Sequence, residues 1–415
     1  IVKDNQMATA VNHGGLYKNL AGLRATNGKC ENNLLKAMGL DYRYVANGND
    51  VNSLIKKFEE VKNISHPVVV HIDTWKGKGY HFAEEDKERW HWSMPFDIET
   101  GELKFTSDAE NYNDLTATYL LEQMKADGKV CAITAGTPGI WGWTPQRREQ
   151  AGKQYVDVGI AEEHAVALAS GIAKSGGKPV FGVCSSFIQR TYDQMSQDLC
   201  INDSPATILV LWASLAAMND VTHLCWFDIP LLSNIPNLVY LAPTNKDEYL
   251  SMLKWSLDYK EHPVAIRVPV GNTVKSSREV PSDFSILNKY EVVHRGKDVA
   301  ILGLGNFYAM GEAVAGLLKE KGIDATVVNP RYISGIDEVL MEDLKDDHKL
   351  IITLEDGALE GGFGEKIARY MGPSSVKVRC YGAKKEFADR YDVSEFFTEN
   401  RLRADLITED VIKLL

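Results

Sequence analysis

The 415-residue sequence lacks the features that mark several large classes of protein. It contains no uninterrupted apolar run near the ~18 residues that a membrane span requires, and its first residues have no signal-peptide character. Its six cysteines show no CxxC spacing, so the sequence indicates neither a zinc site nor a disulfide framework. We therefore expect a cytoplasmic protein with reduced thiols and no association with membranes.

Basic residues are fewer than acidic ones. The sequence has 46 Lys and Arg against 57 Asp and Glu, which gives a formal net charge of −11 at pH 7. This balance argues against electrostatic binding of nucleic acid. No Gly-x-Gly-x-x-Gly follows a first predicted strand, so the sequence lacks the common dinucleotide fingerprint as well.

The length allows two or three domains, each large enough for its own core. Apolar runs typical of buried strands alternate with helical patterns, which predicts βαβ units and parallel sheets. We expect an α/β protein with helices over 50–61 and 309–321 and a polar linker near 271–288. The strands are predicted at 67–72, 130–134, 155–158, 179–183, 207–211, 238–241, 265–268, 299–302, 325–328, 350–354 and 376–379.

The most informative segment lies between residues 156 and 194. After a short apolar strand, Glu162 stands at the start of an alanine-rich helix. The next predicted strand, 179–183, leads directly to Phe187 and Arg190. Because the carboxyl ends of neighbouring parallel strands face one crevice, where open α/β sheets bind ligands, we expect Glu162 and Phe187 to share a site.

Two runs in this segment resemble a known family. DVGIAEEHAV at 157–166 and SSFIQRTYDQ at 185–194 are similar to the pyrimidine-binding domain of thiamine-diphosphate enzymes of the transketolase superfamily, specifically of 1-deoxy-D-xylulose-5-phosphate synthases. The resemblance extends over nearly the whole chain and implies three doubly wound domains. These are a diphosphate-binding domain over 1–108, incomplete at its N-terminus, a pyrimidine-binding domain over 109–275 and a C-terminal transketolase-type domain over 289–415.

The resemblance also implies an activity. Members condense pyruvate with D-glyceraldehyde 3-phosphate to 1-deoxy-D-xylulose 5-phosphate, with loss of CO2, and so supply precursors of isoprenoids and thiamine. It implies thiamine diphosphate and Mg²⁺ as cofactors, pyruvate and an aldehyde acceptor as substrates, and a homodimer.

Glu162 and Phe187 are the residues expected to act on the cofactor. In the family, the matching Glu hydrogen-bonds a ring nitrogen of the aminopyrimidine, and the Phe stacks against that ring. A buried carboxyl suits this role because burial raises its pKa and favours proton sharing. The alternatives are that Glu162 only satisfies a helix N-terminus and that Phe187 is a core residue.

Four further residues are assigned by the resemblance to the first domain. Asn5 through its side-chain oxygen and Met7 through its carbonyl would bind Mg²⁺, which prefers oxygen ligands. Lys76 and His91 would reach the reaction centre as proton donors or acceptors, with Lys76 also near the cofactor. The alternatives are a solvated loop charge for Lys76 and a packing role for His91 between two tryptophans.

Three residues are expected on the acceptor side. Arg190, His223 and Arg267 match family positions that hold the acceptor sugar or its phosphate, and guanidinium groups suit that purpose. The alternatives are ion pairs for both arginines and a structural role for His223.

The acceptor side is also where the sequence departs from the family. Trp212 and Val270 stand where the family has Arg, Cys184 stands where it has Tyr, and Asn219 stands where it has Asp. An anionic phosphate demands charge-assisted donors, and these positions supply none. Two alternatives therefore stay open, a ketol transferase with a different aldehyde acceptor and a non-catalytic subunit of the same fold.

Overall fold

The computed structural model describes residues 1–11 and 13–415. These residues form two compact units. The first unit comprises Ile1–Asp108 with the short segments Gly136–Pro138 and Val158–Ile160, and the second comprises the remainder. Within the described ranges, no helix has the length and apolar character needed to cross a membrane.

The first unit is built on a parallel sheet with the strand order β1-β3-β2. Leu20 and Leu23 from one helix pack on Tyr42, while a separate cluster joins Val70 and Ile72 to another helix, so helices cover both faces. The elements are β1 (Val2–Asp4), β2 (Asp41–Val45), β3 (Val68–Asp73), α1 (Gly15–Ala25), α2 (Leu34–Ala37), α3 (Val51–Val61), α4 (His81–Glu85) and a 3₁₀ turn at Arg89–His91.

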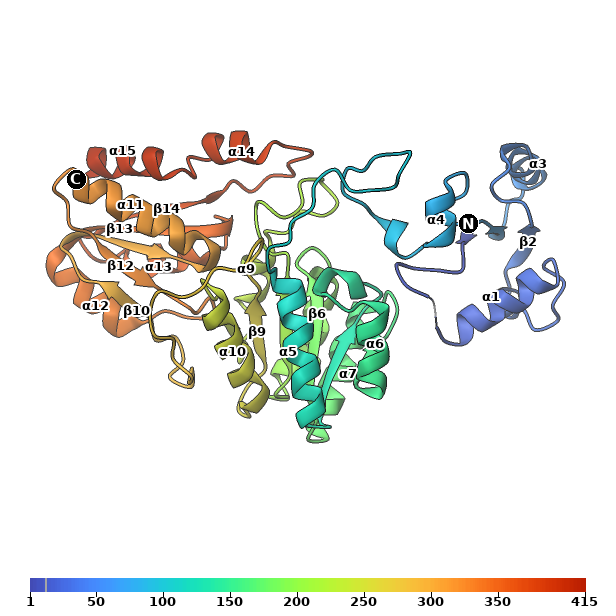
Figure 1. Ribbon diagram of the computed structural model, residues 1–415, viewed down its shortest axis with the longest axis horizontal. Coiled ribbons are helices and arrows are strands. Elements are labelled where there is room, and N and C mark those ends of the chain that lie inside the picture. Colours follow the sequence, from blue (N-terminus) through green and yellow to red (C-terminus); the bar gives the residue numbers. More distant parts are fainter. Residues whose placement is uncertain (12) are drawn as a thin grey trace. The chain divides into compact units, whose positions relative to one another are not determined.

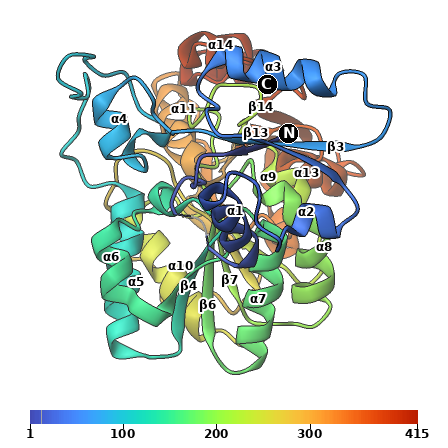
Figure 2. The same ribbon diagram turned by 90° about the vertical axis from the view of Figure 1, so that its right-hand side faces the viewer.

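The second unit contains a six-stranded parallel sheet with the order β5-β4-β6-β7-β9-β8. Figure 2 shows its central strands between α5 and α6 on one side and α7 and α8 on the other. The strands are β4 (Val130–Thr134), β5 (Tyr155–Asp157), β6 (Lys178–Cys184), β7 (Thr207–Leu211), β8 (Val239–Leu241) and β9 (Val264–Arg267).

Helices and turns connect these strands. Asn111 and Asn245 each cap a helix by accepting a hydrogen bond from a backbone N–H of the first turn, which fixes where α5 and α10 begin. The connections are α5 (Tyr112–Ala126), α6 (Pro145–Ala151), α7 (Glu162–Lys174), a 3₁₀ turn at Ile188–Thr191, α8 (Tyr192–Gln194), a π-helical segment at Met195–Cys200, α9 (Asp228–Leu232) and α10 (Lys246–Asp258).

The same unit holds a second sheet with the order β10-β12-β11-β13-β14, in which β10 alone runs antiparallel to its neighbour. Helices α11 and α15 pack against each other beside this sheet (Figure 1). The elements are β10 (Glu291–His294), β11 (Asp298–Gly303), β12 (Thr326–Asn329), β13 (His348–Ala358), β14 (Lys377–Ala383), α11 (Tyr308–Glu320), α12 (Glu338–Asp347), α13 (Phe363–Met371), α14 (Val393–Glu399) and α15 (Ala404–Leu414).

One core joins the two sheets of the second unit. Leu215, Leu224 and Trp226 come from the loop after β7, yet they are buried in the cluster that also contains β11, β13 and α15. The Trp226 ring stacks on Phe396 of α14 with ring centroids 5.1 Å apart. The loop after β7, a strand of the six-stranded sheet, is therefore part of the hydrophobic core beside the five-stranded sheet.

The α/β architecture predicted from the sequence is confirmed, and the predicted strands are present with ends that differ by a few residues. Three strands were not predicted. β1 is only three residues long, β2 reads DYRYV with polar residues in alternate positions, and β10 is an edge strand that is only half-buried. Short or polar strands of this kind give little hydrophobic signal.

Candidate active site

Glu162 is the first residue of α7, directly after the turn that ends β5. Only 3% of the residue is exposed, and its Oε2 atom has no hydrogen-bond partner among residues 1–11 and 13–415. Burial raises the pKa of this carboxyl, and the positive charge of Arg190 opposes the shift only in part. A buried carboxyl oxygen that lacks a hydrogen bond can accept one from a ligand nitrogen, or share a proton with it.

Phe187, three residues after the end of β6, lies beside His223 in the loop after β7. Their ring centroids are 5.6 Å apart with the planes at 69°, an edge-to-face contact. The His223 Nδ1 atom lies 3.1 Å from a carboxylate oxygen of Asp220 and 2.8 Å from the Thr222 hydroxyl. Both rings are partly exposed, so each leaves surface for a ligand.

Arg190 lies between two carboxyl groups. Its Nε atom is 3.5 Å from Glu162 Oε2, and its Nη2 atom is 3.5 Å from Glu163 Oε2. Its side chain is 49% exposed. Both ion pairs are loose, and the one with Glu163 lies at the surface, where ion pairs are weak, so Arg190 remains available to an anionic ligand.

Arg267 is placed differently from Arg190. It is 4% exposed at the end of β9, and its Nε and Nη2 atoms donate to Asp228 over 2.7 and 3.3 Å. Nη2 also donates to the Asp356 carbonyl oxygen over 2.6 Å. This is a buried ion pair, the alternative that the sequence left open, so we do not include Arg267 among the residues proposed to bind the acceptor.

The first unit brings together two residues that the sequence assigned separately. Lys76 Nζ lies 2.9 Å from His91 Nδ1 and donates to the Ala8 carbonyl oxygen over 2.8 Å. Partial burial lowers the pKa of Lys76, and it also lowers the pKa of His91, with the nearby ammonium as a second cause. The pair is thus arranged to hold one proton between two nitrogens.

Asn5 and Met7 lie in the same part of the first unit. The Asn5 side-chain oxygen accepts a hydrogen bond from the Met7 backbone N–H over 3.1 Å. Between them, Gln6 has a φ of 67°, a left-handed conformation that makes the turn tight. A carboxamide oxygen with a second lone pair remains able to bind a cation.

The positions that depart from the family are largely engaged with the protein itself. Trp212 has a φ of 60°, and its ring N–H donates to the Ile140 carbonyl oxygen over 2.9 Å. The Asn219 side-chain amide donates to the Tyr391 carbonyl oxygen over 2.9 Å. The acceptor-side loop therefore presents an aromatic ring where the family presents a guanidinium group.

Sequence reasoning missed the residues that hold this loop in place. The Asp356 carboxylate accepts from the Leu215 backbone N–H over 2.8 Å, and the Tyr391 hydroxyl donates to the Leu215 carbonyl oxygen over 2.7 Å. The Asp228 carboxylate accepts from the Ser185 hydroxyl over 3.1 Å, two residues before Phe187. Ser185 lies within the quoted run 185–194, whereas Asp228, Asp356 and Tyr391 lie outside both quoted runs, and nothing in the run indicated the partner of Ser185.

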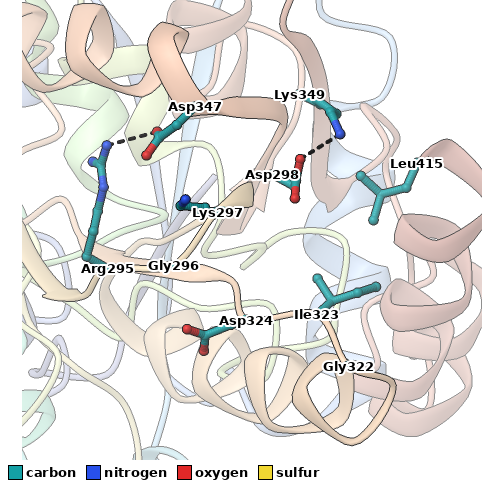
Figure 3. Close-up of a pocket in the computed structure, with 10 residues that line it drawn as sticks. All are labelled: Arg295, Gly296, Lys297, Asp298, Gly322, Ile323, Asp324, Asp347, Lys349 and Leu415. Carbon is teal, nitrogen blue, oxygen red and sulfur yellow. Dashed lines mark hydrogen bonds and ion pairs between the residues drawn. The ribbon is translucent and has the colours of Figure 1, made fainter.

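A pocket of about 600 Å³ lies elsewhere, in the C-terminal part of the second unit. It surrounds the starts of β11 and β13, the edge opposite to the carboxyl ends of these strands. Four of its charged side chains form two ion pairs, Arg295 with Asp347 over 2.9 Å and Lys349 with Asp298 over 2.7 Å (Figure 3). None of the predicted site residues lines it, so we do not assign the reaction to this pocket.

Two family models match the chain. One, described as the transketolase pyrimidine binding domain, matches residues 110–275, and the other, described as the transketolase C-terminal domain, matches residues 288–388. Glu162, Phe187, Arg190 and His223 all lie within the first match.

Relatives that match over most of this chain show which family it belongs to. The chain is 36% identical to the 1-deoxy-D-xylulose-5-phosphate synthase of Alkaliphilus oremlandii, over 92% of this chain and 61% of that protein. It is 32% identical to the 1-deoxy-D-xylulose-5-phosphate synthase of Clostridium beijerinckii, over 100% of this chain and 72% of that protein. The chain belongs to the 1-deoxy-D-xylulose-5-phosphate synthase family. Membership of this family implies thiamine diphosphate as the cofactor.

Solved structures agree with the fold that the 1-deoxy-D-xylulose-5-phosphate synthase family shares with transketolase. A split gene transketolase, described as an inactive beta4 tetramer, matches with a TM-score of 0.64 and 20% identity, over 74% of this chain and 98% of that one. The transketolase of Pichia stipitis in complex with sedoheptulose 7-phosphate matches with a TM-score of 0.60 and 13% identity, over 91% of this chain and 67% of that one.

Proposed function

We propose that the full-length protein condenses pyruvate with D-glyceraldehyde 3-phosphate to 1-deoxy-D-xylulose 5-phosphate, with release of CO2. The observation that carries this proposal is Glu162, a buried carboxyl with a raised pKa and an Oε2 atom that forms no hydrogen bond with the described residues and has only the 3.5 Å ion pair with Arg190. Helix α7, which Glu162 begins, packs against the 3₁₀ turn that directly follows Phe187. The relatives named above support the same activity.

The residues present fit thiamine diphosphate. Glu162 would hold the aminopyrimidine through its Oε2 atom, which forms no hydrogen bond with the described residues, and the partly exposed Phe187 ring would lie against it. Asn5 and Met7 would bind the Mg²⁺ that accompanies the diphosphate, and Lys76 would lie near the cofactor. When bound, thiamine diphosphate supplies the carbanion chemistry that breaks the bond between the two carbonyl carbons of pyruvate.

The chain's own side chains would then manage protons and orientation. Glu162, with its raised pKa, would hold or share the proton at the pyrimidine ring nitrogen. Lys76 and His91, 2.9 Å apart, would pass one proton to or from the reacting oxygen. His223 and Arg190 would orient the acceptor aldehyde, His223 by a hydrogen bond and Arg190 by its exposed guanidinium group.

The wider organisation is proposed on the same basis. Residues 1–108, 109–275 and 289–415 would form the diphosphate-binding, pyrimidine-binding and C-terminal domains. The full-length protein would be a cytoplasmic homodimer, as the family resemblance implies.

A second candidate is ketol transfer to an acceptor that carries no phosphate. Arg267 is buried in its pair with Asp228, and Trp212 occupies the place of a family arginine. Arg190, in loose ion pairs, has a side chain that is about half exposed. This contrast favours an uncharged aldehyde as an alternative acceptor.

The experiment is an acceptor panel with the full-length gene product. With thiamine diphosphate, Mg²⁺ and pyruvate present, we expect D-glyceraldehyde 3-phosphate to give the fastest product formation. If D-glyceraldehyde or another unphosphorylated aldehyde is preferred by more than tenfold, the second candidate replaces the first. Calorimetric titration with thiamine diphosphate separates both from an inert subunit, because a protein that binds no cofactor supports neither.

A further inference from the structure

Two thiols meet beside Phe187 and His223. Cys184 is the last residue of β6, Cys225 follows in the loop after β7, and their Sγ atoms are 3.6 Å apart. The Cys184 Sγ atom is also 3.4 Å from the Ser186 hydroxyl, and the Cys225 thiol donates to the His223 carbonyl oxygen over 3.1 Å. Two residues that are 41 positions apart along the chain thus bring their sulfur atoms into contact.

The surroundings favour a thiolate at Cys184. The contact with the Cys225 sulfur is the main cause that lowers the pKa of Cys184, with further contributions from Ser186 and His223. Cys131 and Cys200 provide the contrast, because burial raises their pKa to about 11 and about 12. Since the thiolate is the nucleophilic form, Cys184 is the more reactive of these sulfurs.

We propose that Cys184 and Cys225 form an oxidative modification site, a dithiol that a peroxide converts into a disulfide. The Cys184 thiolate attacks one oxygen of hydrogen peroxide, the O–O bond breaks, and a sulfenic acid and hydroxide form. The Cys225 sulfur then attacks the Cys184 sulfur. The S–S bond forms as the sulfenic oxygen leaves as water with the Cys225 proton. The two thiols lose two electrons, and the peroxide gains them.

The geometry requires only a small movement. A disulfide has its sulfurs ~2 Å apart, so closing the present gap needs roughly 1.6 Å of approach. Both residues are nearly inaccessible, with 2% and 0% exposed. A small peroxide should therefore react faster than a bulky disulfide such as oxidised glutathione.

The modification would act directly on the candidate active site. Oxidation removes the Cys225 proton that now satisfies the His223 carbonyl oxygen. It also fixes the end of β6 to the loop that carries His223. The proposal does not depend on the reaction assigned above, because the chemistry uses only the two thiols.

The test is mass spectrometry of the folded protein after hydrogen peroxide. We expect the intact mass to fall by two hydrogen atoms and a digest to contain one linked peptide pair with Cys184 and Cys225, both reversed by dithiothreitol. Cys184→Ser and Cys225→Ser should each abolish the linked pair. Cys200→Ser is the matched control, because Cys200 is equally buried, and this variant should still form the link.

The opposite results overturn the proposal. It fails if peroxide leaves the wild-type mass unchanged, if the sulfurs gain oxygen without a link, or if the link joins other cysteines. Circular dichroism checks that each serine variant is folded. If serine at this position disturbs the core, Cys184→Ala provides an apolar variant instead. Linking by oxidised glutathione as fast as by peroxide would contradict the buried geometry.

Discussion

The two segments that carry the candidate site, residues 155–194 and residues 212–227, are held in place in different ways. The segment 155–194 is built from regular elements: β6 is hydrogen-bonded to β4 and β7 on its two sides, and Glu162 opens a 13-residue helix. Residues 212–227, all of them described, form no helix or strand. Local structure fixes the Glu162 side of the site, whereas residues from the C-terminal part of the chain fix the His223 side.

The anchors of this loop come from far along the chain. The Tyr391 hydroxyl donates to the carbonyl oxygens of Leu215 and Met218, over 2.7 and 3.2 Å. The Asp389 carboxylate accepts from the Val221 backbone N–H over 3.1 Å. The difference teaches that a substitution in the C-terminal part of the chain can alter one side of the site and leave the other unchanged.

The largest effect is expected at Glu162. Glu162→Gln keeps the shape of the side chain but cannot share a proton as a carboxyl does, so the rate of product formation should fall about 10²-fold or more. Glu163→Gln is the matched control, since Glu163 has a side chain 43% exposed and also lies beside Arg190. It should change the rate less than tenfold. Equal losses in the two variants would show that charge near Arg190 matters and the proposed proton transfer does not.

A large stability effect is expected at Arg267. Arg267→Met leaves Asp228 buried without its cation, which should lower the free energy of unfolding by about 3–5 kcal/mol. Arg295→Met is the control, because Arg295 pairs with Asp343 and Asp347 at the surface and should cost no more than about 1 kcal/mol. Urea denaturation measures both. A loss below about 1 kcal/mol for Arg267→Met would contradict the role assigned to this pair.

The pH dependence of stability should report on Glu355, the residue before the loop anchor Asp356. It is fully buried, and burial raises its pKa to about 7 although the Phe363 and Gly364 N–H groups donate to it. Between its ordinary value of 4.5 and 7, the folded state binds more protons than the unfolded state. Its contribution is therefore present at low pH and is lost as the pH rises through 7, on the order of 3 kcal/mol in total.

Denaturation at a series of pH values checks this dependence. Glu355→Gln should remove the part of the pH dependence that lies between about 4.5 and 7. Glu360→Gln is the control, because Glu360 forms a surface ion pair with Lys385 and this variant should follow the wild type. A wild-type curve that rises over this range would contradict the assigned sign.

The smallest effect is expected at Tyr391. Tyr391→Phe removes one hydroxyl and two hydrogen bonds to the loop, which should cost about 1–2 kcal/mol of stability. It should also raise the KM for the acceptor and leave the affinity for thiamine diphosphate unchanged. Tyr370→Phe, which removes a surface hydrogen bond to Glu342, should alter neither. Equal changes in acceptor KM and cofactor affinity would show that the loop and the Glu162 side are not independent.

Sequence reasoning predicted the regular elements because their signals are local. The strand at 130–134 and the strand at 207–211 are short apolar runs, and the structure places both at those residues. β2, with its polar DYRYV sequence, was missed because its pairing with β3 and the packing of Tyr42 determine it.

The candidate site was predictable only in part. The motif indicated Glu162 and Phe187, but the contact between Lys76 and His91 spans 15 positions and appears only in the folded chain. Arg267 shows the limit most clearly. Its sequence context suggested phosphate binding, whereas its actual partner Asp228 lies 39 positions away and is also buried. No local pattern encodes such a pairing.

The Tyr391 hydroxyl that bridges two loop carbonyls has a consequence for directed evolution. Libraries aimed at new acceptors usually randomise the residues that would line the pocket. Here, variants at 389–391 would shift the backbone of residues 215–221 without any substitution in that loop. Such distal positions offer a separate route to altered selectivity, one that a search confined to the pocket wall would miss.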